Sequence, residues 1–61
     1  MNEEQKAVKK EILKALIDRE WTTTDLANEM GISRMYLNDL INFRRKSDKR
    51  IIQIKEILGL E

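Results

Sequence analysis

Five side chains suited to contacting base pairs recur at helical spacing between residues 34 and 42. They are Arg34, Met35, Asn38, Asp39 and Asn42. Residues at intervals of one, four, five and eight from the first share one face of an α-helix. Arginine can donate two hydrogen bonds to guanine, asparagine can pair with adenine, aspartate can accept from cytosine, and methionine can meet a thymine methyl group. This face is therefore suited to the major groove of DNA, although a solvated helix surface has a similar composition.

A basic segment, FRRKS at residues 43–47, directly follows this face. Helix N-termini and cationic side chains bind phosphate groups without reading base sequence. We expect such contacts from Thr23 and Ser33 at helix starts, and a hydroxyl contact from Tyr36 on the helix flank. The basic side chains could equally form an ordinary solvated loop.

Asp39 allows two interpretations. A carboxylate that approaches phosphate groups is repelled unless it finds a cytosine amino group or pairs with a basic residue. Arg34 and Arg44 lie nearby in the sequence, and a pair with either would hold that arginine in position or simply occupy the surface.

The elements that must position these residues are predicted to be helices. Apolar residues recur at helical spacing, and the period-2 alternation of half-buried strands appears nowhere. Helices are expected over about residues 3–19, from residue 23 for about eight residues, over about 33–42, and from residue 48 to Gly59. The predicted fold is all-α, a compact bundle of four or five short helices forming a single domain over residues 1–61.

The ends of these helices are marked by residue type. Expected N-caps are Thr22, Ser33 and Ser47. Asp25 follows Thr22 at capping-box spacing. Gly31 and Gly59 are expected to end the second and fourth helices, because glycine adopts the left-handed conformation most cheaply.

Residues 22–42 have the pattern of a helix-turn-helix. The inward-facing positions are Leu26, Met30, Ile32, Leu37 and Leu40. Ala27 lies where the two helices must approach closely, and Gly31 lies in the turn. This combination predicts two helices joined by a tight turn.

The segment TTTDLANEMGISRMYLNDLINFRRKS, residues 22–47, resembles the lambda-repressor-like helix-turn-helix domains of the Cro and phage-repressor (XRE) type. The resemblance implies a DNA-binding transcription regulator, phage or bacterial, that places the recognition helix, about residues 33–42, in the major groove of double-stranded DNA and usually binds as a dimer. It also implies site residues. Base contacts are implied for Arg34, Met35 and Asp39, then Asn38, and phosphate contacts for Asn42, Arg44, Arg45 and Lys46.

The sequence departs from the family pattern at two positions. Thr23 replaces a longer glutamine that commonly contacts the DNA backbone. Phe43 replaces the glycine that usually follows the asparagine. We expect Asn42 to take the left-handed conformation instead, with Phe43 covering the core beneath the connector or, alternatively, lying exposed as an apolar contact.

The composition favours no enzymatic chemistry. The 61 residues include no His and no Cys, so the commonest general base, thiolates and the usual zinc ligands are missing. Ser33 and Ser47 are the only serines, and both are explained as N-caps. We therefore expect no enzyme activity, no cofactor or metal, and no small-molecule substrate.

Charge is unevenly distributed although the formal net charge is +1. Residues 1–31 carry five basic and seven acidic side chains, whereas residues 32–61 carry seven basic and four acidic ones. The near-neutral total predicts modest non-specific affinity for DNA. No signal peptide or membrane-spanning stretch is apparent, and together with the missing cysteines this favours the cytoplasm.

Three further apolar residues widen the helical stripes. Leu13 and Ile17 broaden the stripe of the first helix, and Ile52 lies about a quarter turn from that of the fourth. Either patch could form a homodimer interface, with the dimer stable only on DNA, or all three could be needed in so small a core. The apolar patches also allow an alternative function, an antirepressor-like module that binds another regulator, and Phe43, Ile52 and Asp39 favour this alternative.

Overall fold

Four α-helices make up the protein in the computed structural model, which describes residues 1–60. The helices are α1 (Glu3–Asp18), α2 (Thr23–Met30), α3 (Arg34–Ile41) and α4 (Asp48–Leu58). No strand and no fifth helix occur within these residues. The radius of gyration of 10.5 Å is that of a folded chain of this length. The predicted all-α bundle is therefore confirmed, and of the four or five helices expected, four are present in the described residues.

The predicted N-caps are confirmed. The Oγ1 of Thr22 accepts a hydrogen bond from the backbone N–H of Asp25 at 3.2 Å, and Asp25 Oδ2 accepts from the Thr22 N–H at 2.8 Å, which completes a capping box. Ser33 and Ser47 cap α3 and α4 through the serine oxygen alone, which accepts from the backbone N–H of Tyr36 and of Arg50. These side chains satisfy backbone donors that a helix start leaves without partners, so each helix start is determined locally.

All four helices end with the same backbone geometry. In each case one residue adopts the left-handed conformation, and the N–H of the next residue donates back to the carbonyl five residues earlier. The left-handed residues are Glu20, Gly31, Phe43 and Gly59. The corresponding N–H to carbonyl pairs are Trp21 to Leu16, Ile32 to Ala27, Arg44 to Asp39, and Leu60 to Lys55. The predicted roles of the two glycines are confirmed.

The expected conformation of Asn42 is wrong. Asn42 has φ −90° and ψ 5°, and the following residue, Phe43, takes the left-handed conformation with φ 57°. The left-handed position of this turn is therefore residue 43, although a bulky side chain occupies it. Phe43 is half-buried and lines a surface cavity of about 310 Å³ with Gln5 and Ile51. Within residues 1–60 it is not among the residues that pack against the core cluster, so its predicted role as core cover is also wrong.

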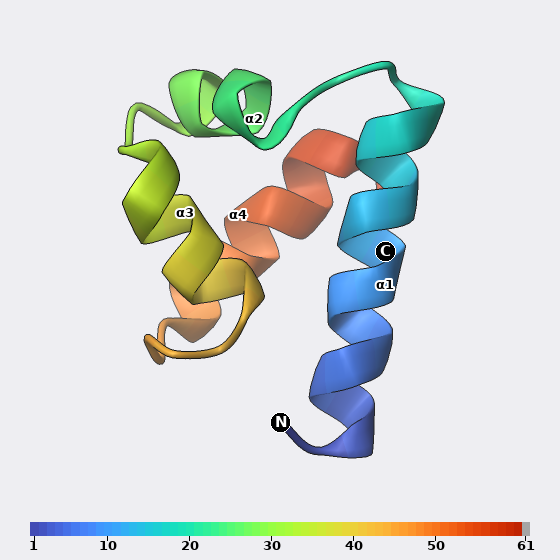
Figure 1. Ribbon diagram of the computed structural model, residues 1–61, viewed down its shortest axis with the longest axis vertical. Helices are drawn as coiled ribbons and strands as arrows, with labels where there is room; N and C mark the ends of the chain where they lie inside the picture. Colours follow the sequence, from blue (N-terminus) through green and yellow to red (C-terminus); the bar gives the residue numbers. More distant parts are fainter. Residues whose placement is uncertain (61) are drawn as a thin grey trace.

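The core lies where the four helices meet. Its fully buried side chains include Ile12 from α1, Leu26 from α2, Leu37 from α3 and Ile54 from α4. Figure 1 shows α3 running at a steep angle to α2 from the turn that joins them, with α4 crossing behind α3 toward α1. Every helix therefore contributes to one apolar cluster, and α3 is held from behind by α4 and from one end by α2.

No helix of the described residues combines the length and the hydrophobicity needed to cross a membrane.

Candidate nucleic-acid interface

The turn between α2 and α3 fixes the direction of α3. Only residues 31–33 separate the two helices, and Gly31 has φ 71°. Ala27 is buried against the neighbouring helix, and Ile32 packs on the core. Leu26, Met30, Leu37 and Leu40 are buried as expected, whereas Ile32 is half-buried. The arrangement is a helix-turn-helix, with α3 in the position of the second helix.

The side chains on the outward face of α3 differ in their exposure to solvent, from fully exposed to half-buried. Leu37, Leu40 and Ile41 point into the core. On the opposite side, Arg34 is exposed and Met35 is 75% exposed, the largest value among the big apolar residues. Asn38 and Asp39 are half-buried. The structure therefore places the four predicted base-reading residues on the accessible side of α3, with Arg34 and Met35 most open to an approaching groove.

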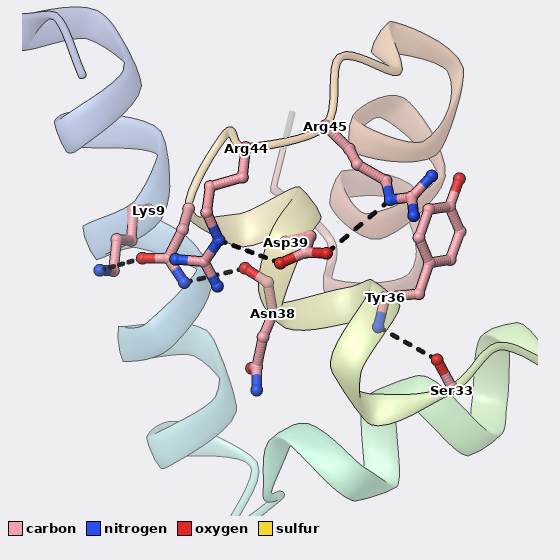
Figure 2. A network of polar contacts seen from close by, with 8 residues as sticks. Lys9, Ser33, Tyr36, Asn38, Asp39, Arg44 and Arg45 are labelled. Atoms are coloured by element: carbon pink, nitrogen blue, oxygen red, sulfur yellow. Dashed lines mark hydrogen bonds and ion pairs between the residues drawn. The ribbon is translucent and has the colours of Figure 1, made fainter.

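Asp39 pairs with the basic connector between α3 and α4. Its Oδ1 lies 3.0 Å from Arg44 Nε, and its Oδ2 lies 3.8 Å from Arg45 Nε. Figure 2 shows the carboxylate between the two arginines. Of the two interpretations of Asp39, the structure shows the one with a basic partner, and that partner set is Arg44 with Arg45 rather than Arg34.

Tyr36 holds the same connector from another side. The guanidinium carbon of Arg45 lies 5.1 Å from the centre of the Tyr36 ring, and that of Arg50, on α4, lies 6.0 Å from it. A guanidinium over an aromatic face is attracted by the ring's electron density. Tyr36 therefore links α3, the connector and α4, a packing role beyond the hydroxyl contact that the sequence suggested.

Asn42 faces α1 and is engaged within the protein. Its Oδ1 accepts a hydrogen bond from Lys9 Nζ at 2.6 Å, and its Nδ2 donates to the Asn38 carbonyl at 2.8 Å. These two bonds connect α1 to the end of α3, and Figure 2 labels Lys9 and Asn38 on either side of them. The contact brings Lys9, which sequence reasoning did not select, to the edge of the candidate interface. Since the two residues are 33 positions apart, only the folded chain reveals it.

The remaining predicted phosphate contacts lie at helix starts and in the connector. Ser33 is exposed, but its Oγ accepts from the Tyr36 N–H at 3.1 Å, so its hydroxyl is already used as a cap. Thr23 is half-buried at the first position of α2, and Lys46 is exposed in the connector. The structure thus places Ser33 at the start of α3 and the basic residues of the connector at its end.

The described residues contain no group of three or more acidic side chains that could hold a metal ion, and no buried side-chain nitrogen or oxygen lacks a hydrogen-bond partner. The cavity beside Phe43 is also lined by Lys46, Ser47 and Asp48, and the Ser47 Oγ there accepts a hydrogen bond from the Arg50 backbone N–H as the cap of α4.

Three apolar residues lie outside the core. Ile17 is 73% exposed, Ile52 is 56% exposed, and Leu13 is also classed as exposed. The possibility that all three are needed inside the core is therefore wrong for the single chain, and the possibility that they form an interface remains open.

The fold and the site define a small all-α protein with a helix-turn-helix and a basic connector. Comparisons with protein-family models, with curated proteins and with solved structures found no match.

Proposed function

We propose that the protein is a sequence-specific DNA-binding transcription regulator that acts by occupying an operator, with no catalytic step. The observation that carries the proposal is the accessible face of α3, on which Arg34 and Met35 are exposed while the opposite face of the helix is buried in the core. An α-helix fits the major groove of B-form DNA. Arg34 would contact guanine, Met35 a thymine methyl group, and Asn38 an adenine.

Phosphate contacts would come from both ends of α3. Arg44 and Arg45 remain 62% and 63% exposed at their side chains although each is paired with Asp39. A guanidinium has five N–H donors, so pairing through Nε leaves others for a phosphate. Lys46 in the connector and Lys9 on α1 would add charge at the same edge.

Recognition of a full operator would require two copies. A single eight-residue helix reads few base pairs, and two-fold dimers that read two half-sites are the common solution. Ile52 on α4 and the pair Leu13 and Ile17 on α1 are the candidate contacts between copies. We propose a homodimer that forms on DNA, in a bacterial or phage-infected cytoplasm.

Selection of bound duplexes from a random library tests this proposal. We expect enrichment of a palindromic sequence with guanine in each half-site, because the dimer would place one Arg34 in each. Enrichment of no sequence above the starting library would contradict the proposal. A matched selection with Arg34→Ala should lose the guanine while retaining the palindrome.

A second candidate is a protein-interaction module that binds another regulator. The observation that favours it is the exposure of Ile17 and Ile52, each large and apolar, because exposed apolar residues can mark contact sites for other proteins. Under this alternative, the wild-type protein would form a stable heterodimer and show no affinity for any duplex. Ile52→Lys would then abolish the complex, whereas Arg34→Ala would not affect it.

A further inference from the structure

Asp39 contacts two consecutive arginines of the connector through both its backbone and its side chain. Its carbonyl oxygen accepts from the backbone N–H of Arg44 at 2.8 Å and of Arg45 at 3.4 Å. Its two carboxylate oxygens face the Nε atoms of the same two residues at 3.0 and 3.8 Å. One residue of α3 thus fixes where the connector leaves the helix and where its guanidinium groups point.

Tyr36 adds a second fixed point for Arg45. Tyr36 and Asp39 lie three residues apart on α3, a spacing that makes them neighbours on the helix surface. The Arg45 guanidinium contacts the Asp39 carboxylate through Nε and lies over the Tyr36 ring. Figure 2 shows Tyr36 and Asp39 both turned toward Arg45. The side chain is therefore oriented by two groups before any ligand is present.

The carboxylate itself is poorly placed to reach a base. Only 26% of the Asp39 side-chain surface is exposed, compared with 62% and 63% for its two arginine partners. Its charge is outweighed by the two guanidinium groups, so the cluster as a whole stays cationic. A DNA backbone that approaches this surface would meet the arginines first.

We propose that Asp39 is a positioning residue, which orders Arg44 and Arg45 for contact with DNA phosphates and reads no base itself. This inference rests on the DNA-binding function proposed above. Ordering a long side chain during binding opposes association, and Asp39 removes that penalty in advance. The expected change in DNA affinity is opposite to that of simple charge repulsion. Removing the negative charge of Asp39 beside the DNA should weaken binding rather than strengthen it.

The test compares Asp39→Asn with Asp48→Asn. Both substitutions remove one negative charge next to the connector, but within residues 1–60 Asp48 forms no ion pair with it. Dissociation constants are measured by fluorescence anisotropy on a library-selected duplex and on a scrambled duplex of equal length. We expect Asp39→Asn to weaken binding about 2- to 10-fold on both duplexes, and Asp48→Asn to bind at least as tightly as wild type.

Three results would overturn the inference. Tighter binding by Asp39→Asn would mean that simple repulsion dominates, a loss confined to the selected duplex would mean that Asp39 reads a base, and an equal loss in Asp48→Asn would mean that the ion pairs are irrelevant. Circular dichroism verifies that each variant is folded. Should Asp39→Asn not fold, Arg44→Lys keeps the connector's charge but removes the Nε–H, and the same equal loss on both duplexes is expected.

An NMR measurement on the free protein separates this inference from the proposed function. The Nε–H signal of Arg44 should exchange slowly with water in wild type and rapidly in Asp39→Asn. If that contrast is found but wild type binds neither duplex, the DNA-binding function fails and the phosphate role of the cluster fails with it. If wild type binds the selected duplex but the contrast is absent, the positioning role alone is wrong.

Discussion

Two turns flank α3, and they share a backbone geometry while differing in their side chains. After α2, Gly31 is left-handed and the N–H of Ile32 donates to the Ala27 carbonyl at 3.0 Å. After α3, Phe43 is left-handed and the N–H of Arg44 donates to the Asp39 carbonyl at 2.8 Å. The first turn uses the residue type that fits this conformation, whereas the second places a bulky aromatic residue in it.

The two turns also differ in the contacts that their side chains make. In this type of helix end, the residue after the left-handed one commonly makes an apolar contact with the last turn of the helix. Ile32 packs on the core in the first turn, whereas in the second turn Arg44 forms an ion pair with Asp39. The first turn serves the packing of α2 against α3, and the second keeps positive charge at the surface. Phe43 thus combines a strained backbone conformation with a position next to that charge.

The largest predicted effect is on DNA binding, and it distinguishes a substitution on the outward face of α3 from one in the second turn. Arg34→Ala should weaken binding to the selected duplex by about 1–3 kcal/mol, because a contact to guanine is lost. It should change binding to a scrambled duplex much less. Arg45→Ala should weaken binding to both duplexes alike, because a phosphate contact carries no sequence information. Titrations of both variants on both duplexes measure this, and identical patterns from the two variants would contradict the assigned roles.

Gly31→Ala tests the first turn. Space does not limit the substitution, because a Cβ at Gly31 meets no atom within 4 Å, so only the left-handed backbone opposes it. We expect a loss of about 1–2 kcal/mol in the free energy of unfolding, measured by urea denaturation. Thr24→Ala, at an exposed position of α2, is the control and should change stability by less than about 0.5 kcal/mol. Equal effects would show that the conformation of Gly31 is unimportant.

Phe43 provides the reverse substitution in the second turn. Phe43→Ala removes the side chain but keeps a residue that resists the left-handed conformation, whereas Phe43→Gly removes both. The glycine variant should therefore be more stable than the alanine variant by about 1 kcal/mol, the same order of glycine over alanine as at position 31. Thermal melting of the two variants measures the difference. An alanine variant as stable as the glycine variant would show that the second turn is not strained.

Glu20 extends the comparison to the end of α1, with the smallest expected effect. It is exposed and left-handed, with φ 59°, so Glu20→Gly should stabilise the protein by about 0.4–1 kcal/mol. Glu11→Gly, exposed in the middle of α1, should instead destabilise it by a similar amount. Chemical denaturation of both variants provides the measurement. If Glu20→Gly and Glu11→Gly both lost stability, the left-handed conformation of Glu20 would not be strained as that of Phe43 is expected to be.

The helix boundaries could be predicted from the sequence because their causes are local. Thr22, Ser33 and Ser47 cap the backbone within three residues of themselves, and the two glycines are the residues that adopt a left-handed conformation at least cost. Glu20 and Phe43 could not be found in this way, because nothing in their residue type indicates a positive φ. Their conformations follow from hydrogen bonds at helix ends that the surrounding packing holds in place.

The sequence was enough to predict which face of α3 carries the candidate site. It was not enough to predict the contacts that the site residues make with one another and with other elements. Helical spacing alone places Arg34 and Met35 on the exposed side of α3. The choice between a base and an arginine as partner of Asp39 depends on the path of the connector, and the contact of Asn42 with Lys9 depends on where α1 packs. The exposure of Ile17 and Ile52 could not be predicted either, because a widened apolar stripe on a helix can lie in the core or on the surface.

A salt-dependent titration of the wild-type protein against duplex DNA tests the central claim most directly, since it reports counterion release and sequence preference together. Binding should weaken linearly in log–log form as salt rises, because phosphate contacts release counterions. At each salt concentration, the library-selected duplex should bind about 10³-fold or more tightly than a scrambled one. Absence of any salt-dependent binding to either duplex would contradict the account.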